Sequence, residues 1–125
     1  MKTLVVDDNA DNRELIKEIL SLRSINCFEA KSGLDAIKLA IQHDFRIIFM
    51  DVQMPLINGL NTTNVLRNKI LPKNSQTKII AVTAYTEYKN DSISSWFDEI
   101  IPKPIEIERI NACISNELLR ISNQK

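Results

Sequence analysis

The run Ile47-Ile48-Phe49-Met50 constrains the fold of this chain more than any other segment. A strand with one face in solvent alternates apolar and polar side chains, whereas this run is apolar at every position. It therefore predicts a strand covered on both faces, as in the middle of a parallel sheet. Residues 78–82, which are apolar after Lys78, form a second run of this kind, and Asp51 and Thr83 directly follow the two runs.

Strand-like and helix-like segments alternate along the whole chain. Stripes of apolar residues at spacings of three and four, typical of helices, separate the short apolar runs. We expect strands near residues 4–6, 27–30, 47–50, 78–82 and 99–101, and helices near 10–22, 34–41, 60–71, 88–95 and 107–121. This alternation predicts an α/β fold with a mainly parallel sheet. No linker or repeat interrupts it, so we expect one domain over residues 1–125.

The composition excludes several functional classes. Sixteen basic and sixteen acidic residues give no net charge, which argues against a nucleic-acid-binding protein or a polybasic membrane surface. The longest apolar run is far shorter than the roughly 20 residues that span a bilayer, and no secretory leader is apparent. The two cysteines, Cys27 and Cys113, lack metal-ligand spacing, so we expect reduced thiols and a cytoplasmic location.

Polar side chains follow four of the expected strands. Asp7 and Asp8 come after the first, Asp51 after the third, Thr83 after the fourth and Lys103 after the fifth. Ligands of open α/β sheets bind at the carboxyl ends of the strands, so these side chains should meet at one edge. Singly, each has an ordinary structural explanation, such as a helix cap, a β-former or a surface lysine. Their shared position favours a functional site.

The chemistry of this set indicates a phosphoryl group held beside a metal ion. Gathered carboxylates repel one another, at a cost on the order of 4 kcal/mol for two charges 4 Å apart at an effective dielectric of 20. A hard divalent cation such as Mg²⁺ relieves that repulsion. A cation, an ammonium and a hydroxyl that converge on one carboxylate are suited to bind phosphoryl oxygens.

The motifs that carry these residues form an ordered set. They are Val5-Val6-Asp7-Asp8-Asn9, Met50-Asp51-Val52-Gln53-Met54-Pro55 with Gly59 beyond, Thr83-Ala84 and Lys103-Pro104. The set resembles the signature of the response-regulator receiver domain, the CheY-like phosphoacceptor of two-component signalling, over essentially the whole chain. The resemblance implies a doubly wound, five-stranded parallel sheet of order 2-1-3-4-5 with five helices.

The resemblance also implies a metal site. Asp8 and Asp51 would bind Mg²⁺, or Mn²⁺ in its place, directly. Asp7 would bind it chiefly through water, and the backbone carbonyl of Gln53 would complete the protein ligands.

For the phosphoryl group, the resemblance implies that Asp51 is the acceptor. Lys103 would pair with Asp51 and then with a phosphoryl oxygen, held by a cis Lys103-Pro104 bond. The Thr83 hydroxyl and the Ala84 N–H would donate to the phosphoryl group. The domain would catalyse only its own phosphorylation and dephosphorylation, and would not be an enzyme in the ordinary sense.

The implied partners are proteins. A histidine kinase or a histidine phosphotransfer protein would supply the phosphoryl group, and a downstream target would bind the face made by the fourth helix, fifth strand and fifth helix. This face departs from the family pattern, because Ile100 stands where an aromatic residue is usual and Trp96-Phe97 replaces a small pair. We predict that Trp96 and Phe97 contribute to the partner surface, although the two rings could instead cover the sheet edge. The segment 88–95 is poor in helix formers, so a short or mobile helix is expected there.

Two other functions stay open on the sequence. A degenerate receiver would act as a phosphate-independent interaction module, which Ile100 leaves possible. A phosphatase of the haloacid-dehalogenase type also uses an aspartyl nucleophile and Mg²⁺, but it normally carries Asp-x-Asp after the first strand. Flavodoxin-like cofactor binding is weaker still, because no hydroxyl-rich loop follows the first strand.

Overall fold

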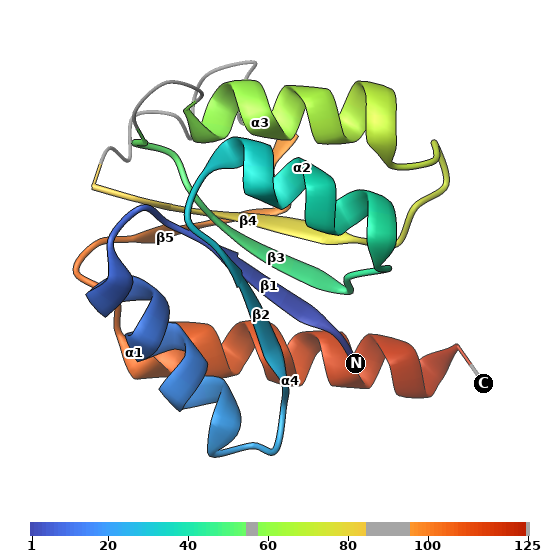
Figure 1. The fold of residues 1–125 in the computed structure, drawn as a ribbon. Coiled ribbons are helices and arrows are strands. Elements are labelled where there is room, and N and C mark those ends of the chain that lie inside the picture. Colours follow the sequence, from blue (N-terminus) through green and yellow to red (C-terminus); the bar gives the residue numbers. More distant parts are fainter. Residues whose placement is uncertain (55–57, 85–95, 125) are drawn as a thin grey trace.

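The computed structural model describes residues 1–54, 58–84 and 96–124. Strands and helices alternate along the chain (Figure 1). The elements are β1 (Thr3–Val6), α1 (Ala10–Ser21), β2 (Cys27–Ala30), α2 (Gly33–Gln42), β3 (Ile47–Asp51), α3 (Gly59–Val65), η1 (Leu66–Ile70), β4 (Lys78–Thr83), β5 (Glu99–Pro102) and α4 (Ile107–Asn123). All five expected strands are present, at nearly the expected residues.

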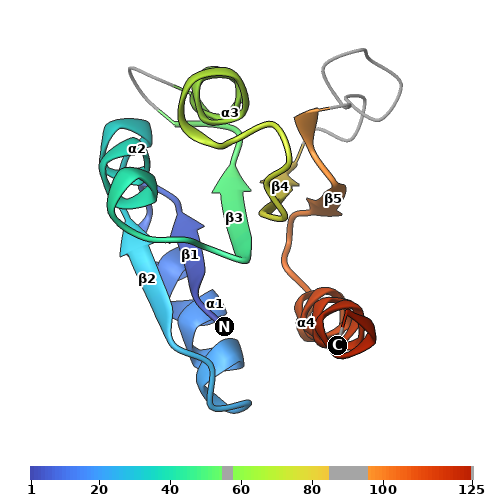
Figure 2. The same cartoon turned by 90° about the vertical axis from the view of Figure 1, so that its right-hand side faces the viewer.

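The five strands form one parallel sheet in the order β2-β1-β3-β4-β5, which confirms the predicted topology. α2 and α3 cover one face, and α1 and α4 cover the other (Figures 1 and 2). Alternate residues of β3 enter two separate cores: Ile48 and Met50 pack toward α2 and α3, while Ile47 and Phe49 pack toward α1 and α4. All four are at most 1% exposed, so burial on both faces of the sheet explains the uninterrupted apolar run, as predicted.

Side-chain caps begin three of the described helices. Asn9, Ser32 and Asn58 each precede a helix and accept a hydrogen bond from the backbone N–H three residues later. Such caps satisfy N–H groups that have no partner within the helix. The loops after β1 and β3 therefore end at defined residues, which matters because both loops follow candidate site residues.

The third helix differs from its prediction. One continuous helix was expected over residues 60–71, but α3 passes at Leu66 into the wider turn η1, where the Leu71 N–H bonds to the Leu66 carbonyl at 2.7 Å. This bond joins residues five positions apart, as in a π-helix. The apolar spacing cannot distinguish such a turn from an α-helix, since both bury the same side of the segment.

The helix expected at 88–95 lies outside the described residues, which contain four α-helices against the five expected. Phe97 requires a correction. It is 7% exposed and packs in the core beside α3, so it cannot contribute to a partner surface as predicted, while Trp96 is half-buried. Cys113 is buried and Cys27 half-buried, and both thiols are free. No described helix has the length and apolar character needed to cross a membrane.

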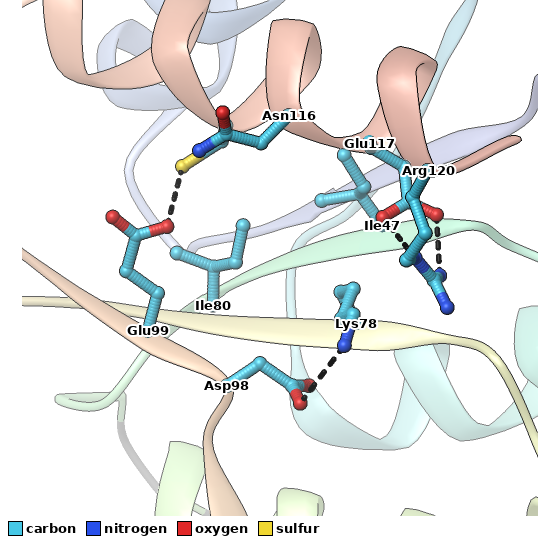
Figure 3. A pocket seen from close by; sticks show the side chains of 9 residues that line it. Ile47, Lys78, Ile80, Asp98, Glu99, Asn116, Glu117 and Arg120 are labelled. Carbon is cyan, nitrogen blue, oxygen red and sulfur yellow. Dashed lines mark hydrogen bonds and ion pairs between the residues drawn. The ribbon is translucent and has the colours of Figure 1, made fainter. Parts of the chain in front are cut away.

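A hollow of about 210 Å³ lies where the strands begin, between β3–β5 and α4 (Figure 3). Its walls carry opposite charges in contact, such as Lys78 with Asp98 at 3.7 Å and Glu117 with Arg120. None of the predicted site residues lines it. It is therefore separate from the carboxyl ends of the strands.

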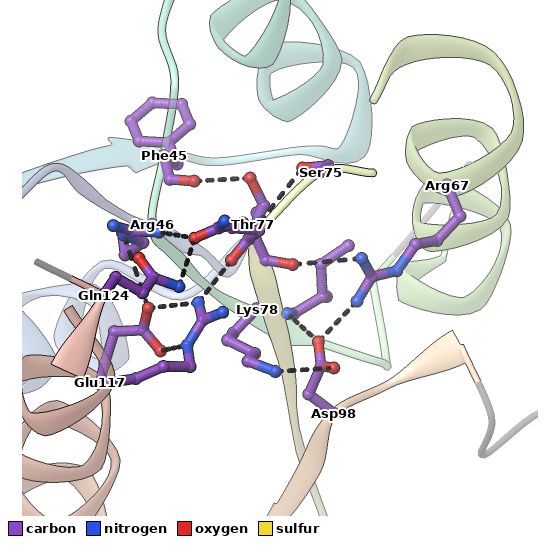
Figure 4. A network of polar contacts seen from close by, with 12 residues as sticks. Phe45, Arg46, Arg67, Ser75, Thr77, Lys78, Asp98, Glu117 and Gln124 are labelled. Atoms are coloured by element: carbon purple, nitrogen blue, oxygen red, sulfur yellow. Dashed lines mark hydrogen bonds and ion pairs between the residues drawn. The ribbon is translucent and has the colours of Figure 1, made fainter. Parts of the chain in front are cut away.

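Polar contacts tie the elements together at this same end (Figure 4). Arg67 in η1 donates to the carbonyls of Thr77 and Trp96, both at 3.1 Å, and to the Asp98 carboxylate at 2.6 Å. Asp98 also accepts the Ile79 N–H at 2.9 Å. These bonds hold the start of β5 against β4 and η1. They stabilise the end of the sheet where the strands begin, which is opposite to the carboxyl ends of the strands.

Candidate functional site

Four parallel strands deliver their last residues to one edge of the sheet. Because the register pairs Val6 with Met50, Asp51 with Val82 and Thr83 with Pro102, the residues that end or follow these strands are neighbours. The predicted gathering at the carboxyl ends follows directly from this register.

Three carboxylates meet at this edge. One oxygen each of Asp7, Asp8 and Asp51 lies within 4.8 Å of the other two. Asp7 and Asp51 are each 3% exposed, whereas Asp8 is exposed to solvent. The cluster is thus a buried pair of acids with a third acid at its mouth, and an ion could enter from the Asp8 side.

Lys103 supplies the opposite charge. Its Nζ lies 3.3 Å from Asp51 Oδ1 and 3.6 Å from Asp7 Oδ2. The Lys103 N–H donates to the Thr83 carbonyl at 2.9 Å, and the Lys103-Pro104 peptide is cis, as the resemblance implied. The ammonium therefore bridges the two buried carboxylates from a backbone that is bonded to β4.

The backbone orients both buried carboxylates. The Asn9 N–H donates to Asp7 Oδ1 at 2.9 Å, and the Gln53 N–H donates to Asp51 Oδ1 at 3.1 Å. Both bonds connect an acid to the residue two positions later, a local turn typical of aspartate. Oδ1 of Asp51 thus receives both the Gln53 N–H and the Lys103 ammonium.

The remaining predicted residues lie next to this cluster along the chain. Thr83 is fully buried at the end of β4, Ala84 follows it and is exposed, and the Gln53 side chain is exposed. The structure thus brings together Asp7, Asp8, Asp51 and Lys103. The roles of Thr83, Ala84 and the Gln53 carbonyl stay predictions.

Burial raises the pKa of Asp51 from an ordinary value of 3.8 to about 6. The negative charge of Asp7 acts in the same direction, while the Gln53 N–H and the Lys103 ammonium oppose the rise. Burial and a neighbouring like charge both disfavour the ionised carboxylate. The folded chain therefore holds the Asp51 proton more tightly than the unfolded chain does.

We predict that Asp51→Asn stabilises the metal-free protein at neutral pH. Since the folded-state pKa is raised, the stability linked to this group is complete below pH 3.8 and is lost as the pH rises through about 6. The asparagine variant lacks this loss, so its free energy of unfolding should exceed that of the wild type by about 2 kcal/mol at pH 7, with little difference at pH 4. Urea unfolding in the presence of EDTA at several pH values measures this, and a difference that does not change with pH would contradict it.

Gly59 packs against the backbone of the Asp51 segment. A Cβ at Gly59 would lie 2.2 Å from the Asp51 carbonyl oxygen and 2.6 Å from Val52 Cα, while its N–H bonds to the Val52 carbonyl at 2.9 Å. Only a residue without a side chain allows α3 to begin so close to the loop after β3.

We therefore expect Gly59→Ala to lower the free energy of unfolding by about 3 kcal/mol, because the methyl group must displace backbone and not a flexible side chain. Chemical denaturation measures this change. Ala112→Gly, on the exposed side of α4, is a control for glycine in a helix and should cost only about 1 kcal/mol. If Gly59→Ala lowers the free energy of unfolding no more than this control does, the backbone at Asp51 and Val52 moves to accommodate the methyl group.

The charge balance of the cluster suits a divalent cation. Three carboxylates against one ammonium leave two net negative charges when all three acids are ionised. Carboxylate oxygens are the ligands that hard cations such as Mg²⁺ prefer. The donors that the chain offers here therefore fit the metal that the resemblance implied.

One further residue of this edge lies outside the set predicted from the sequence. Arg13, on α1, donates from Nη1 to the Asp7 carbonyl at 2.9 Å. Its position six residues after Asp7 could have indicated that its side chain returns to the end of β1, since it lies in the first turns of the helix that follows.

Comparison with known proteins agrees with this geometry. Residues 3–115 match the family described as the response regulator receiver domain. The signal transduction histidine-protein kinase BarA of Escherichia coli (strain K12) is 34% identical over 122 residues. That match covers 96% of this chain but only 13% of BarA, so the chain spans a small part of its curated relative.

Solved structures show the same fold. The response regulator protein TrrA from Thermotoga maritima, in complex with Mg²⁺ and BeF, is 30% identical with a TM-score of 0.82, over 93% of this chain and 97% of TrrA. A structure of the histidine kinase ThkA in complex with TrrA matches with 32% identity and a TM-score of 0.81, over 94% of this chain and 97% of the matched one.

Proposed function

The chain belongs to the response regulator receiver domain family, a signalling module of two-component systems, and from this premise we propose that it accepts a phosphoryl group on Asp51. The observation that carries the proposal is the contact of the Asp51 carboxylate with the Lys103 ammonium at 3.3 Å, beside Asp7 and Asp8. We further propose that residues 1–125 act as one receiver domain in the cytoplasm.

In the proposed reaction, an Asp51 carboxylate oxygen attacks the phosphorus of a phosphohistidine. The new O–P bond forms as the P–N bond breaks, and the imidazole nitrogen leaves with the bonding electron pair. We assign Oδ2 as the attacking oxygen, because Oδ1 already accepts the Gln53 N–H and the Lys103 ammonium. The product is an acyl phosphate on Asp51, and attack of water on its phosphorus would return the carboxylate and inorganic phosphate.

Mg²⁺, or Mn²⁺ in its place, would neutralise phosphoryl oxygens in this site. Asp8 and Asp51 are proposed as direct ligands, Asp7 as a ligand through water and the Gln53 carbonyl as the remaining protein ligand. Lys103, which contacts the Asp51 carboxylate, would hold a second phosphoryl oxygen. The Thr83 hydroxyl and the Ala84 N–H are proposed to donate to the phosphoryl group.

The proposed partners follow from this chemistry. The donor is a histidine kinase or a histidine phosphotransfer protein, which agrees with the complex of ThkA with the similar protein TrrA. We propose that output passes through a protein that binds β5, α4 and the segment before β5, where Trp96 is half-buried. Of Trp96 and Phe97, the two residues predicted for this surface, Trp96 is the one that can take part in such a contact.

The direct test is incubation with Mg²⁺ and acetyl phosphate, followed by intact mass spectrometry. We expect one added phosphoryl group, and none when EDTA removes the metal. No phosphoryl group under either condition would instead support the phosphate-independent interaction module. Sustained hydrolysis of p-nitrophenyl phosphate would support the phosphatase.

A further inference from the structure

Arg13 connects three elements next to the acid cluster. From α1, its Nη1 donates to the Asp7 carbonyl at 2.9 Å, and its Nε donates to Glu29 of β2 at 2.8 Å. The Arg13 side chain is 16% exposed, so the guanidinium is largely enclosed. The Glu29 carboxylate also accepts a hydrogen bond from the Lys17 ammonium at 2.6 Å. The hydrogen bonds from Lys17 and from Arg13, of which that from Lys17 is the larger cause, lower the pKa of Glu29. Glu29 is thus ionised at neutral pH.

The carbonyl that Arg13 contacts belongs to the peptide bond between Asp7 and Asp8. Because a peptide unit is planar, fixing this oxygen also fixes the N–H and Cα of Asp8. On the other side of Asp7, the Asp7 N–H donates to the Ala30 carbonyl at 3.1 Å. The backbone that enters the acid cluster is therefore bonded on both sides of Asp7.

The position of the Asp8 carboxylate depends on this backbone more than the position of the Asp7 carboxylate does. The Asp7 carboxylate is oriented by the Asn9 N–H and by Lys103, at 2.9 and 3.6 Å. The exposed Asp8 side chain makes no hydrogen bond or ion pair with the rest of the described chain. Since no such contact holds its carboxylate, the Asp8 backbone is the part of its placement that the rest of the described chain controls.

We propose that Arg13 is a positioning residue for the divalent cation: held by Glu29, it fixes the Asp7–Asp8 peptide and so presents the Asp8 carboxylate to the metal. This inference rests on the proposed function, because it assigns a role toward the same site. Groups that orient metal ligands commonly change metal affinity by tenfold or more when they are removed.

A simpler role for Arg13 predicts the opposite result. If Arg13 acted only as a positive charge near the carboxylates, its removal would strengthen Mg²⁺ binding, because one repulsive charge would be gone. Positioning predicts weaker binding after the same substitution. The sign of the change therefore distinguishes the two roles.

The experiment is isothermal titration calorimetry with MgCl₂ on the wild type, Arg13→Met, Lys17→Met and Glu29→Gln, with folding checked by circular dichroism. We expect Arg13→Met to raise the Kd for Mg²⁺ about tenfold. Lys17 is the matched control, since it lies on the same helix and binds the same carboxylate without contacting Asp7. Its pair is partly exposed, so Lys17→Met should change the Kd by no more than about twofold.

Glu29→Gln keeps the contact between Arg13 and Asp7 but removes the ion pair, so its Kd should lie between those of the wild type and Arg13→Met. If Arg13→Met does not fold, Arg13→Lys decides the matter, because it keeps the positive charge without the planar guanidinium that binds both the Asp7 carbonyl and Glu29. A raised Kd in Arg13→Lys supports the inference, and a wild-type Kd overturns it. Binding by Arg13→Met as tight as wild type, or tighter, also overturns it while leaving the proposed function intact. A wild type that binds no Mg²⁺ overturns both.

Discussion

Asp51→Asn is expected to take up no phosphoryl group from acetyl phosphate and Mg²⁺, under conditions in which the wild type takes up one. Asparagine has nearly the shape of aspartate, but its amide oxygen is a poor nucleophile and cannot form an acyl phosphate. Asp51 is also the carboxylate that Lys103 contacts most closely, at 3.3 Å. Intact mass spectrometry over a time course measures the uptake.

The matched control is Asp44→Asn. Asp44 is exposed in the segment that precedes β3, at the opposite end of the strand from Asp51. Its variant should gain one phosphoryl group at the wild-type rate. Uptake by Asp51→Asn, or its loss in Asp44→Asn, would show that the acceptor has been assigned to the wrong carboxylate.

Lys103→Met should slow the phosphorylation of Asp51 on the order of a hundredfold, the usual effect of removing one preorganised donor from a charged transition state. The ammonium lies within 3.6 Å of both buried carboxylates, so it offsets negative charge where nucleophile and phosphoryl oxygens must approach each other. Methionine keeps the length of the side chain and removes only its charge and its donors.

Lys73→Met, in the exposed loop before β4, is the control for loss of one positive charge. Its phosphorylation rate should equal that of the wild type. The rate constants come from the same mass measurement at several acetyl phosphate concentrations. Equal rates in Lys103→Met and Lys73→Met would mean that the ammonium has no part in the reaction.

Most of the fold could be predicted because burial leaves a direct trace in the sequence. Ile47 to Phe49 enter alternate cores, and a strand covered on both sides has no polar position to alternate with. The site followed from the same pattern, since Asp51 and Thr83 stand where apolar runs end and parallel strands place those ends together.

Other features depend on contacts that periodicity does not record. The Arg13 contact joins α1 to the end of β1 and to β2. The position of Arg13 in the first turns of α1 indicates that its side chain lies near the end of β1, but not which carbonyl and carboxylate it binds. Phe97 was predicted at the surface because Trp96-Phe97 replaces the small pair usual in the family, yet its ring is buried in the core cluster that contains Leu66. The raised pKa of Asp51 comes chiefly from burial, which only the packed structure determines.

Diffraction from crystals soaked in Mn²⁺ determines whether carboxylates from two strand ends converge on a divalent cation beside Asp51. Anomalous scattering locates the ion without assuming its ligands. We predict one strong peak bounded by the side chains of Asp7, Asp8 and Asp51, on the side of the cluster open to solvent. Soaked crystals with no peak among these three carboxylates, or with Asp8 turned away from an ion bound elsewhere, would contradict it.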